Sequence, residues 1–118
     1  MRLYIGGCFQ GQAEIAHRET GLVPRTVGRE EAVSAPAIDR FHELIRGLTP
    51  AEARAFAGEL IEKNPDCVIV CDEVGMGVVP MAAEDRLWRE AVGAAVCRLA
   101  SGAERVTRAV CGIPVRIK

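Results

Sequence analysis

The sequence lacks the features that would assign it to a membrane, a nucleic acid or a repeat architecture. No apolar run approaches the ~20 residues that span a bilayer, and no secretory signal peptide is evident, so we expect a cytoplasmic protein. The net charge of −1 gives no electrostatic reason to expect a nucleic acid or a membrane surface as a partner. No internal repeat or low-complexity segment is present.

Cysteine is present but without a functional spacing. The five cysteines are an odd number and include no Cys-x-x-Cys pair, which argues against a disulfide framework and against a zinc site. Four of them (Cys67, Cys71, Cys97 and Cys111) lie within or beside apolar segments. Reduced cysteine behaves there as a small hydrophobic residue, so we predict a structural role for these four.

The order of the expected elements is typical of an α/β protein. The chain is 118 residues long, which is most simply one domain, 1–118. Strands are expected at 2–5, 67–71, 105–111 and 115–117, and helices at 12–19, from Pro36 to about 48, 50–63 and 84–101. Residues 21–35 show no periodicity and are predicted to form a mobile loop. A small, mostly parallel sheet with a short C-terminal edge strand follows, and its poorly covered edges predict self-association.

The stretch from Cys67 to Pro80 is the strongest candidate for a functional site. An apolar run leads directly into Asp72 and Glu73, and a loop containing Gly75 and Gly77 follows. Open α/β sheets bind ligands at the carboxyl ends of their strands. Two carboxylates there can hold a metal ion or accept a proton, as in a Walker B element, and glycines let backbone amides approach a phosphate. The alternative is that one of the acids caps a neighbouring turn.

A second candidate site follows the first expected strand. Its residues are Gly6, Gly7, Cys8, Phe9, Gln10, Gly11, Gln12 and Ala13. They fit the frame Gly-x-x-x-x-Gly of a phosphate-binding loop, but Gln12 and Ala13 stand where Lys and Ser/Thr are expected. Backbone amides at the start of a helix still favour a phosphate, whereas the cation and a Mg²⁺-binding hydroxyl are lost. A tight turn that binds no ligand remains an equal alternative.

Other polar residues are weaker candidates. His42 lies beside the apolar face of its expected helix with Arg46 one turn later, and a lone histidine there is more often structural or exposed to solvent. Arg86 and Arg89 could bind phosphates, although arginines on an amphipathic helix are usually solvated. Trp88 has the spacing of a core residue.

The second half of the chain resembles the adenosylcobinamide kinase / adenosylcobinamide-phosphate guanylyltransferase family of cobalamin biosynthesis. The segment Asp-Glu-Val-Gly-Met-Gly-Val-Val-Pro at 72–80 is similar to Asn-Glu-Val-Gly-Met-Gly-Ile-Val-Pro of the family. The ending Cys-Gly-Ile-Pro-Val-Arg-Ile-Lys at 111–118 is similar to Ser-Gly-Ile-Gly-Val-Lys-Ile-Lys. Arg86, Arg89 and Gly93 and the Arg-Leu-Ala at 98–100 extend the similarity. The loop at 6–13 matches only in part, and the middle of the chain is barely alignable.

The resemblance implies a P-loop-type three-layer α/β/α fold, often trimeric, with GTP or ATP and Mg²⁺ bound at the loop that ends in Gly11. Such proteins phosphorylate a corrinoid hydroxyl and then transfer a guanylyl group through a histidine that Arg follows four residues later. His42 and Arg46 reproduce this spacing. The acidic strand that follows the histidine in the family has no obvious counterpart. Asp72 replaces the family's Asn and is therefore a candidate metal ligand.

Two functions are consistent with these residues. The first is a nucleotide-dependent transferase acting on cobinamide, with His42, Asp72 and Glu73 as catalytic residues, the loop 6–13 binding nucleotide, and Arg46, Gly75, Gly77, Arg86 and Arg89 contacting substrate or phosphate. The second is a non-catalytic subunit that binds a nucleotide or a corrinoid. Gln12 and Ala13 favour the second function. A purely structural assembly module is a third possibility.

Overall fold

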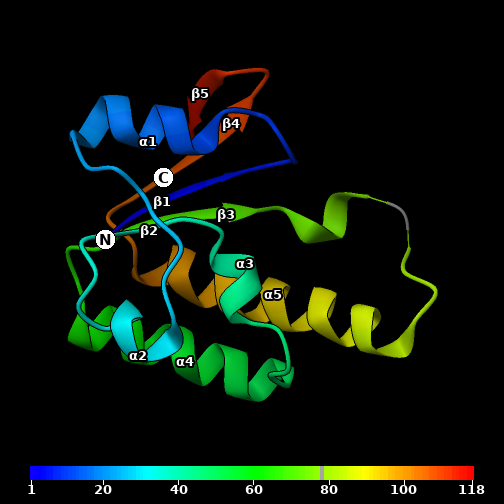
Figure 1. Ribbon diagram of the computed structural model, residues 1–118. Coiled ribbons are helices and arrows are strands. Elements are labelled where there is room, and N and C mark those ends of the chain that lie inside the picture. The colour runs from blue at the N-terminus through cyan, green and yellow to red at the C-terminus, as the bar shows by residue number, and fades with distance from the viewer. Residues whose placement is uncertain (78) are drawn as a thin grey trace.

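The computed structural model describes residues 1–77 and 79–118, which form five strands and the helices packed on them (Figure 1). The strand order is β2-β3-β1-β4-β5, with the bounds β1 (Arg2–Gly6), β2 (Ala37–Ile38), β3 (Val68–Asp72), β4 (Arg105–Val110) and β5 (Ile113–Arg116). The first four strands in this order are parallel, and β5 is antiparallel to β4. The predicted α/β class with a mostly parallel sheet and a C-terminal edge strand is confirmed.

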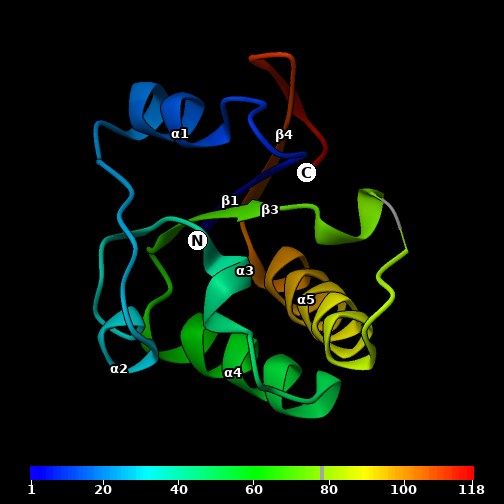
Figure 2. The same cartoon turned by 45° about the vertical axis from the view of Figure 1, so that its right-hand side comes forward.

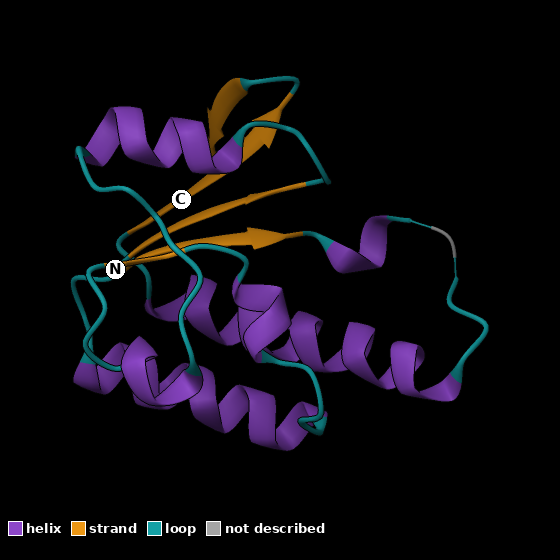
Figure 3. Cartoon of the chain, in the orientation of Figure 1, coloured by secondary structure: helices purple, strands orange, loops and turns teal. Residues whose placement is uncertain are grey.

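Helices cover both faces of the sheet, so that the structure has three layers (Figures 1 and 3). Helix α1 (Gln12–Thr20) lies alone on one face. The other face carries α2 (Arg29–Ala32), α3 (Phe41–Leu44), α4 (Pro50–Lys63) and α5 (Ala83–Gly102). Figure 2, turned by 45°, shows the same separation of α1 from the long helices. A 3-10 helix, η1 (Val74–Met76), follows β3.

Each face of the sheet has its own apolar core. The larger core packs the sheet against α3, α4 and α5, and its fully buried residues include Leu3, Ile38, Phe41, Ile45, Leu60, Ile69 and Leu99. The smaller core lies under α1 and consists of Tyr4, Ile15, Ala16, Ala37, Val68, Val70 and Ala109. Burial on both faces explains the continuous apolar run of β3. Cys67 and Cys71 are buried, as predicted, whereas Cys97 and Cys111 are exposed.

The register of the parallel strands brings their carboxyl ends to one edge. Gly6 at the end of β1 pairs with Asp72 of β3 on one side and with Ala109 of β4 on the other. The chain leaves β1 for strands on one side of it and returns to β4 on the other side. Such a change of direction is the position at which α/β sheets bind ligands. The two segments that the sequence singled out therefore meet at this edge.

Several elements form where the sequence predicted them. Helix α4 begins with the predicted capping box, in which Thr49 Oγ1 accepts from Glu52 N at 3.2 Å and Thr49 N donates to Glu52 Oε1 at 3.0 Å. The strands β1 and β3 and the helices α1 and α5 lie within two residues of their expected bounds. Local signals sufficed for these elements because the caps and the periodicities lie within them.

The helix expected from Pro36 to about residue 48 is wrong. Ala37 and Ile38 form β2 beside β3, and Arg40 then takes a left-handed backbone conformation with φ 53°. Only Phe41–Leu44 is α-helical. The apolar residues that we expected on one helical face lie partly in β2 (Ile38) and partly in α3 (Phe41 and Leu44). All of them pack into the larger core. Pairing with β3 therefore overrides the local helical pattern.

The loop expected at 21–35 is wrong in part, because α2 lies within it. Val27, Ala32 and Ala35 are buried in the larger core. The Asn64 amide nitrogen donates to the carbonyls of Ala32 and Ala35, at 2.9 and 2.8 Å. At the C-terminus, β5 begins at Ile113, where a turn was expected, and Pro114 is accepted because β5 is an edge strand.

Self-association stays a prediction for this chain. All four residues of β5 are exposed, including Ile113 and Val115, and Ile117 beyond it is exposed as well. An uncovered edge strand with apolar side chains is a surface on which another chain can pair. In the part of the chain that the structure describes, no helix has the length and apolar character needed to cross a membrane.

The capping box of α4 gives a test of the fold. We expect Thr49→Ala to lower the free energy of unfolding by about 1 kcal/mol, because the amide of Glu52 loses its acceptor. Thr49→Ser keeps a hydroxyl at the cap and is expected to stay within about 0.5 kcal/mol of the parent protein. Chemical denaturation followed by circular dichroism measures both, and equal losses in the two variants would contradict the assignment.

Candidate functional site

The carboxyl edge of the sheet carries two adjoining pockets. The larger one, of about 600 Å³, lies between the loop at 6–13 and the end of β3, and its lining includes Phe9, Gln12 and Asp72. The smaller one, of about 390 Å³, lies on the side of α3 and its lining includes His42 and Gly77. Cys8, Arg40 and Asp72 border both pockets. The structure therefore brings the predicted loop, Asp72 and His42 together.

The loop between β1 and α1 is held in one shape by its glycines and by the β4–β5 turn. Gly11 takes a φ of 87°, which favours glycine. A Cβ at Gly6 would lie 3.0 Å from the carbonyl oxygen of Ala109, so a side chain there would push the neighbouring strand away. Gln10 Oε1 accepts from Cys111 N at 2.7 Å, and the Gln10 carbonyl accepts from the Gly112 amide at 2.9 Å.

The side chain of Gln12 ties this loop to the end of β3. Its Nε2 donates to Gly6 O at 3.3 Å, to Gly7 O at 3.0 Å and to Asp72 Oδ1 at 2.7 Å. The residue is only 5% exposed. A neutral amide thus holds the loop carbonyls together and ties the loop to β3, without adding positive charge to the site.

Asp72 is the residue that links the loop to the rest of the site. Its Oδ1 accepts from Gln12, and its Oδ2 accepts from the Cys8 thiol at 3.4 Å. The hydrogen bond and the negative charge of Asp72 raise the pKa of Cys8 above its ordinary value. Cys8 is therefore a neutral thiol at physiological pH and a poor nucleophile.

His42 is buried behind Asp72. Its Nδ1 accepts a hydrogen bond from the Asp72 backbone amide at 3.1 Å, and its Nε2 lies 3.7 Å from both Asp72 Oδ2 and Glu43 Oε1. Trp88 Nε1 donates to the His42 carbonyl at 2.8 Å and so fixes its backbone. Burial lowers the pKa of His42, and the carboxylates of Asp72 and Glu43 oppose that shift. Trp88 serves the site in this way rather than lying fully in the core.

Glu73 makes different contacts from its neighbour. Its carboxylate accepts from Arg108 Nε at 3.0 Å, and its backbone amide donates to Gly6 O at 2.7 Å. Glu73 borders the smaller pocket and a third, mostly apolar pocket of about 410 Å³ beside α5. Glu73 is paired with Arg108 and borders only the smaller of the two adjoining pockets, whereas Asp72 borders both, so the structure favours Asp72 over Glu73 for contact with a ligand.

The predicted phosphate-binding arginines do not line the two pockets. Arg46 stacks over the ring of Trp88 at 3.7 Å and pairs with Glu43. Arg86 donates to the carbonyls of Pro80 and Met81. Arg89 borders the third pocket, near Gly75. Their roles in substrate binding stay predictions.

Sequence reasoning missed Asp39 and Arg40. Asp39 follows β2 and borders the larger pocket together with Asp72. Arg40 borders both pockets, and its backbone is in the left-handed conformation. Phe9, in the loop at 6–13, also has a left-handed backbone, with φ 57°. Strained residues of this kind cluster at functional sites. Ala37 and Ile38 are an apolar pair followed by the acid Asp39, as the apolar residues of β3 are followed by Asp72. A strand of two residues is too short for its periodicity to be recognised in the sequence.

Asp39 and Asp72 could hold a metal ion only if a bound ligand supplied further oxygen atoms to it. Among residues 1–77 and 79–118, no group of three or more His, Cys, Asp and Glu side chains is placed to hold a metal ion. Mg²⁺ in nucleotide sites takes one or two carboxylates, and phosphates and water complete its coordination. Asp72 and Asp39, which border one pocket, would supply the protein's share.

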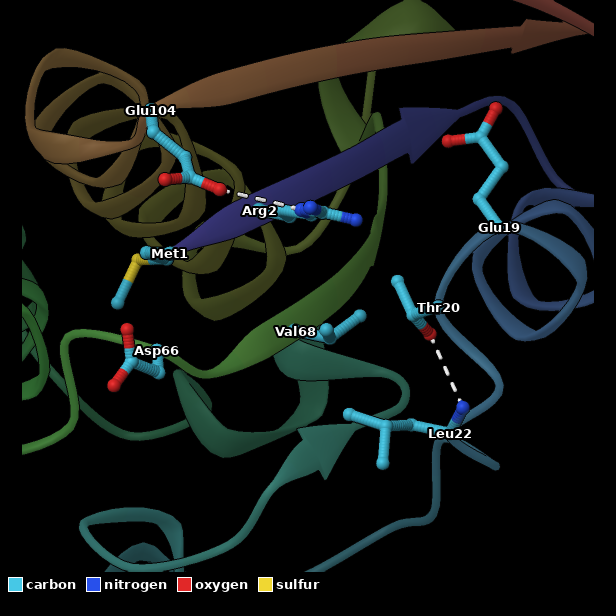
Figure 4. A pocket seen from close by; sticks show the side chains of 8 residues that line it. All are labelled: Met1, Arg2, Glu19, Thr20, Leu22, Asp66, Val68 and Glu104. Atoms are coloured by element: carbon cyan, nitrogen blue, oxygen red, sulfur yellow. Dashed lines mark hydrogen bonds and ion pairs between the residues drawn. The ribbon is translucent and has the colours of Figure 1, made fainter.

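A further pocket, of about 320 Å³, lies at the opposite ends of the strands (Figure 4). It surrounds Met1 and Arg2 at the start of β1, and Arg2 pairs with Glu104 at 3.3 Å. Glu19 and Asp66 add further negative charge to its rim. These residues offer neither a glycine-rich loop nor the carboxyl end of a strand, so this pocket is not our candidate site.

The buried His42 predicts a dependence of stability on pH. Its pKa in the folded protein lies below the ordinary value of 6.5, so its contribution is complete above that pH and is lost as the pH falls toward the folded pKa. We expect stability to fall by at most about 1.4 kcal/mol per pH unit from this group. Thermal unfolding between about pH 8 and pH 5 should show a steeper loss for the parent protein than for His42→Asn. Equal slopes in the parent protein and in His42→Asn would contradict this assignment.

Comparison with known families bears on the same part of the chain. The family model described as cobinamide kinase / cobinamide phosphate guanyltransferase matches residues 37–117, from β2 to the end of β5 and one residue beyond. The loop at 6–13 lies outside the matched range. No curated protein matches the chain. The match supports a function of the kinase and guanyltransferase kind in cobalamin biosynthesis, where the family uses a nucleotide and a corrinoid substrate. The resemblance seen in the sequence is thus confirmed, and the chain belongs to the cobinamide kinase / cobinamide phosphate guanyltransferase family.

Proposed function

We propose that this chain binds a nucleoside triphosphate, GTP or ATP, together with a cobinamide-type corrinoid at the carboxyl edge of its sheet, and that its capacity for phosphoryl transfer is greatly reduced. The observation that carries this proposal is the Gln12 side chain, which donates to two loop carbonyls and to Asp72. The family match supports the ligand classes. The loop geometry supports binding of a phosphate.

Gln12 replaces the part of the loop on which phosphoryl transfer most depends. A loop lysine supplies a cation to the β- and γ-phosphates as negative charge develops on them. The Gln12 amide carries no charge, and its hydrogen bonds are directed to the protein. It keeps the loop closed around the start of α1, where backbone amides favour a phosphate. Binding geometry is thereby preserved while stabilisation of the transition state is lost.

The charges that border the pocket make binding of the triphosphate dependent on a divalent cation. Glu14, Asp39 and Asp72 are acidic and border the larger pocket, and Arg40 is the basic side chain at the junction of the two pockets. These three carboxylates repel a triphosphate unless a cation lies between them. Mg²⁺ would provide that charge, held by Asp72 and Asp39 together with the phosphates.

The kinase reaction is the second candidate, and Asp39 favours it. A second acid beside Asp72 in one pocket is the arrangement that holds Mg²⁺ on a transferred phosphate. This candidate requires that the metal alone replace the missing lysine. Incubation of the protein with GTP or ATP, Mg²⁺ and cobinamide, followed by mass spectrometry for cobinamide phosphate, separates binding from turnover.

Asp72→Asn tests the proposed role of the carboxylate. We expect this variant to lose at least about tenfold in affinity for GTP in the presence of Mg²⁺, because one metal ligand becomes neutral. In EDTA the variant should bind GTP no more weakly than the parent protein, because the substitution removes a charge that repels the phosphates. Isothermal titration calorimetry with GTP and with ATP measures both conditions. Asp66→Asn, at the opposite end of β3, is the matched control, and unchanged binding in Asp72→Asn would remove the proposal.

Gln12→Lys tests the role of the missing cation. The ammonium group would lie beside the loop carbonyls and Asp72 and face the phosphates, so we expect about tenfold tighter binding of the triphosphate. Gln12→Met has a similar volume without hydrogen-bond donors and should weaken binding. Calorimetry under the same conditions decides between them. No gain in Gln12→Lys would show that the loop does not contact the phosphates.

A further inference from the structure

The two ring nitrogens of His42 have fixed and different roles. Nδ1 accepts the Asp72 backbone N–H at 3.1 Å. A nitrogen that accepts an N–H must carry a free lone pair, so the proton of the neutral ring lies on Nε2. A proton on Nδ1, in the other tautomer or in the cation, would oppose two N–H groups at this distance. The backbone of β3 therefore selects one tautomer.

The surroundings of the ring hold this arrangement in place. His42 is 5% exposed, and its backbone carbonyl is bound by the indole of Trp88 at 2.8 Å. The two rings lie 6.1 Å apart and are tilted by 57°. The Nε2 side of the ring faces Asp72 Oδ2 and Glu43 Oε1, each at 3.7 Å. Both acceptors suit a nitrogen that carries a proton.

This arrangement is the reverse of the one that a nucleophilic histidine needs. A histidine that attacks phosphorus does so with an unprotonated nitrogen open to the substrate, while an acceptor holds the proton of its other nitrogen. In this chain the unprotonated nitrogen is used by a backbone amide, and the other nitrogen, which faces the pocket-lining residues Asp72 and Glu43, carries the proton. No lone pair of the ring is available to a nucleotide.

We propose that His42 is a positioning residue, which fixes the backbone of Asp72 through Nδ1 and directs its Nε2 proton toward the carboxylates of Asp72 and Glu43, and that it does not carry a guanylyl group. The inference rests on the proposed function in one respect, the contact of Asp72 with bound nucleotide. It assigns to His42 a role other than that of the family's histidine, which its spacing from Arg46 had suggested.

The tautomer is measured first, on the full chain without any ligand. Long-range proton–nitrogen correlation spectra near pH 8 distinguish the two tautomers and the cation. We expect the Nε2–H form for His42. His17, whose Nδ1 lies 3.0 Å from the Leu22 carbonyl, is an internal reference and should carry a proton on Nδ1. A proton on Nδ1 of His42 would overturn the proposal.

Two variants separate the Nδ1 role from the Nε2 role. In His42→Asn, an amide oxygen can take the place of Nδ1 and accept from Asp72, whereas in His42→Gln the amide group reaches the place of Nε2 instead. Calorimetry should find GTP affinity in the presence of Mg²⁺ within about threefold of the parent protein for His42→Asn and at least about tenfold weaker for His42→Gln. Equal losses in both variants, or a larger loss in His42→Asn, would contradict positioning through Nδ1. Circular dichroism confirms that each variant is folded.

Covalent labelling tests the excluded role directly. The parent protein is incubated with GTP labelled at the α-phosphate and Mg²⁺, and it is then kept alkaline because phosphorus–nitrogen bonds are labile in acid. We expect no label on the protein, and label located on His42 by mass spectrometry would refute the proposal. If the parent protein binds no nucleotide at all, the proposed function fails, whereas the tautomer measurement still decides the state of His42.

Discussion

The parallel pairing of β1 with β3 is the constraint on which the site depends. It places Gly6 opposite Asp72, so that the loop leaving β1 and the acid ending β3 occupy the same edge of the sheet. The backbone continues this connection beyond the ladder, because Glu73 N donates to Gly6 O at 2.7 Å. A slip of one residue would turn Asp72 and its neighbours to the opposite faces and separate the loop from its acid. The burial of β3 on both faces fixes the register and thereby the site.

Hydrogen bonds then connect this edge into one network. Gln12 joins the loop to Asp72, Asp72 joins β3 to His42, and Trp88 joins His42 to α5. Each of these polar groups is wholly or partly buried, and each donor named here has an acceptor. Hydrogen bonds that connect buried side chains in this way make the network rigid and costly to disturb. The side chains of Gln12 and His42 are therefore better suited to hold a ligand site in shape than to take part in chemistry.

The range of the chain that matches the family model agrees with a structural role for Gln12. The matched range begins at β2 and contains Asp39, His42, Asp72 and the closing strands. The loop at 6–13, which in P-loop proteins supplies the catalytic cation, lies outside it. In the proposed function, the chain keeps a ligand-binding fold but carries the neutral amide of Gln12 at the position of the loop lysine. In the proposed function, ligand recognition and catalytic power are properties of different segments.

The sequence by itself determined the elements whose signals are local. The capping box at Thr49, the apolar run of β3, the amphipathic α5 and the closing segment with its family resemblance all lie within short stretches of chain. The presence of Asp72 and of the glycine loop at a common edge also followed, because parallel strands align their carboxyl ends.

Only the tertiary structure decided what depends on partners distant in the chain. Ala37 and Ile38 pair with β3 instead of forming a helix, and this pairing brings Asp39 and Arg40 to the pockets. Glu73 is paired with Arg108, 35 residues later, and is thereby distinguished from Asp72. The tautomer of His42 depends on a backbone amide 30 residues away. Composition and spacing specify which groups a chain carries, whereas hydrogen-bond partners specify the protonation state in which those groups meet a ligand.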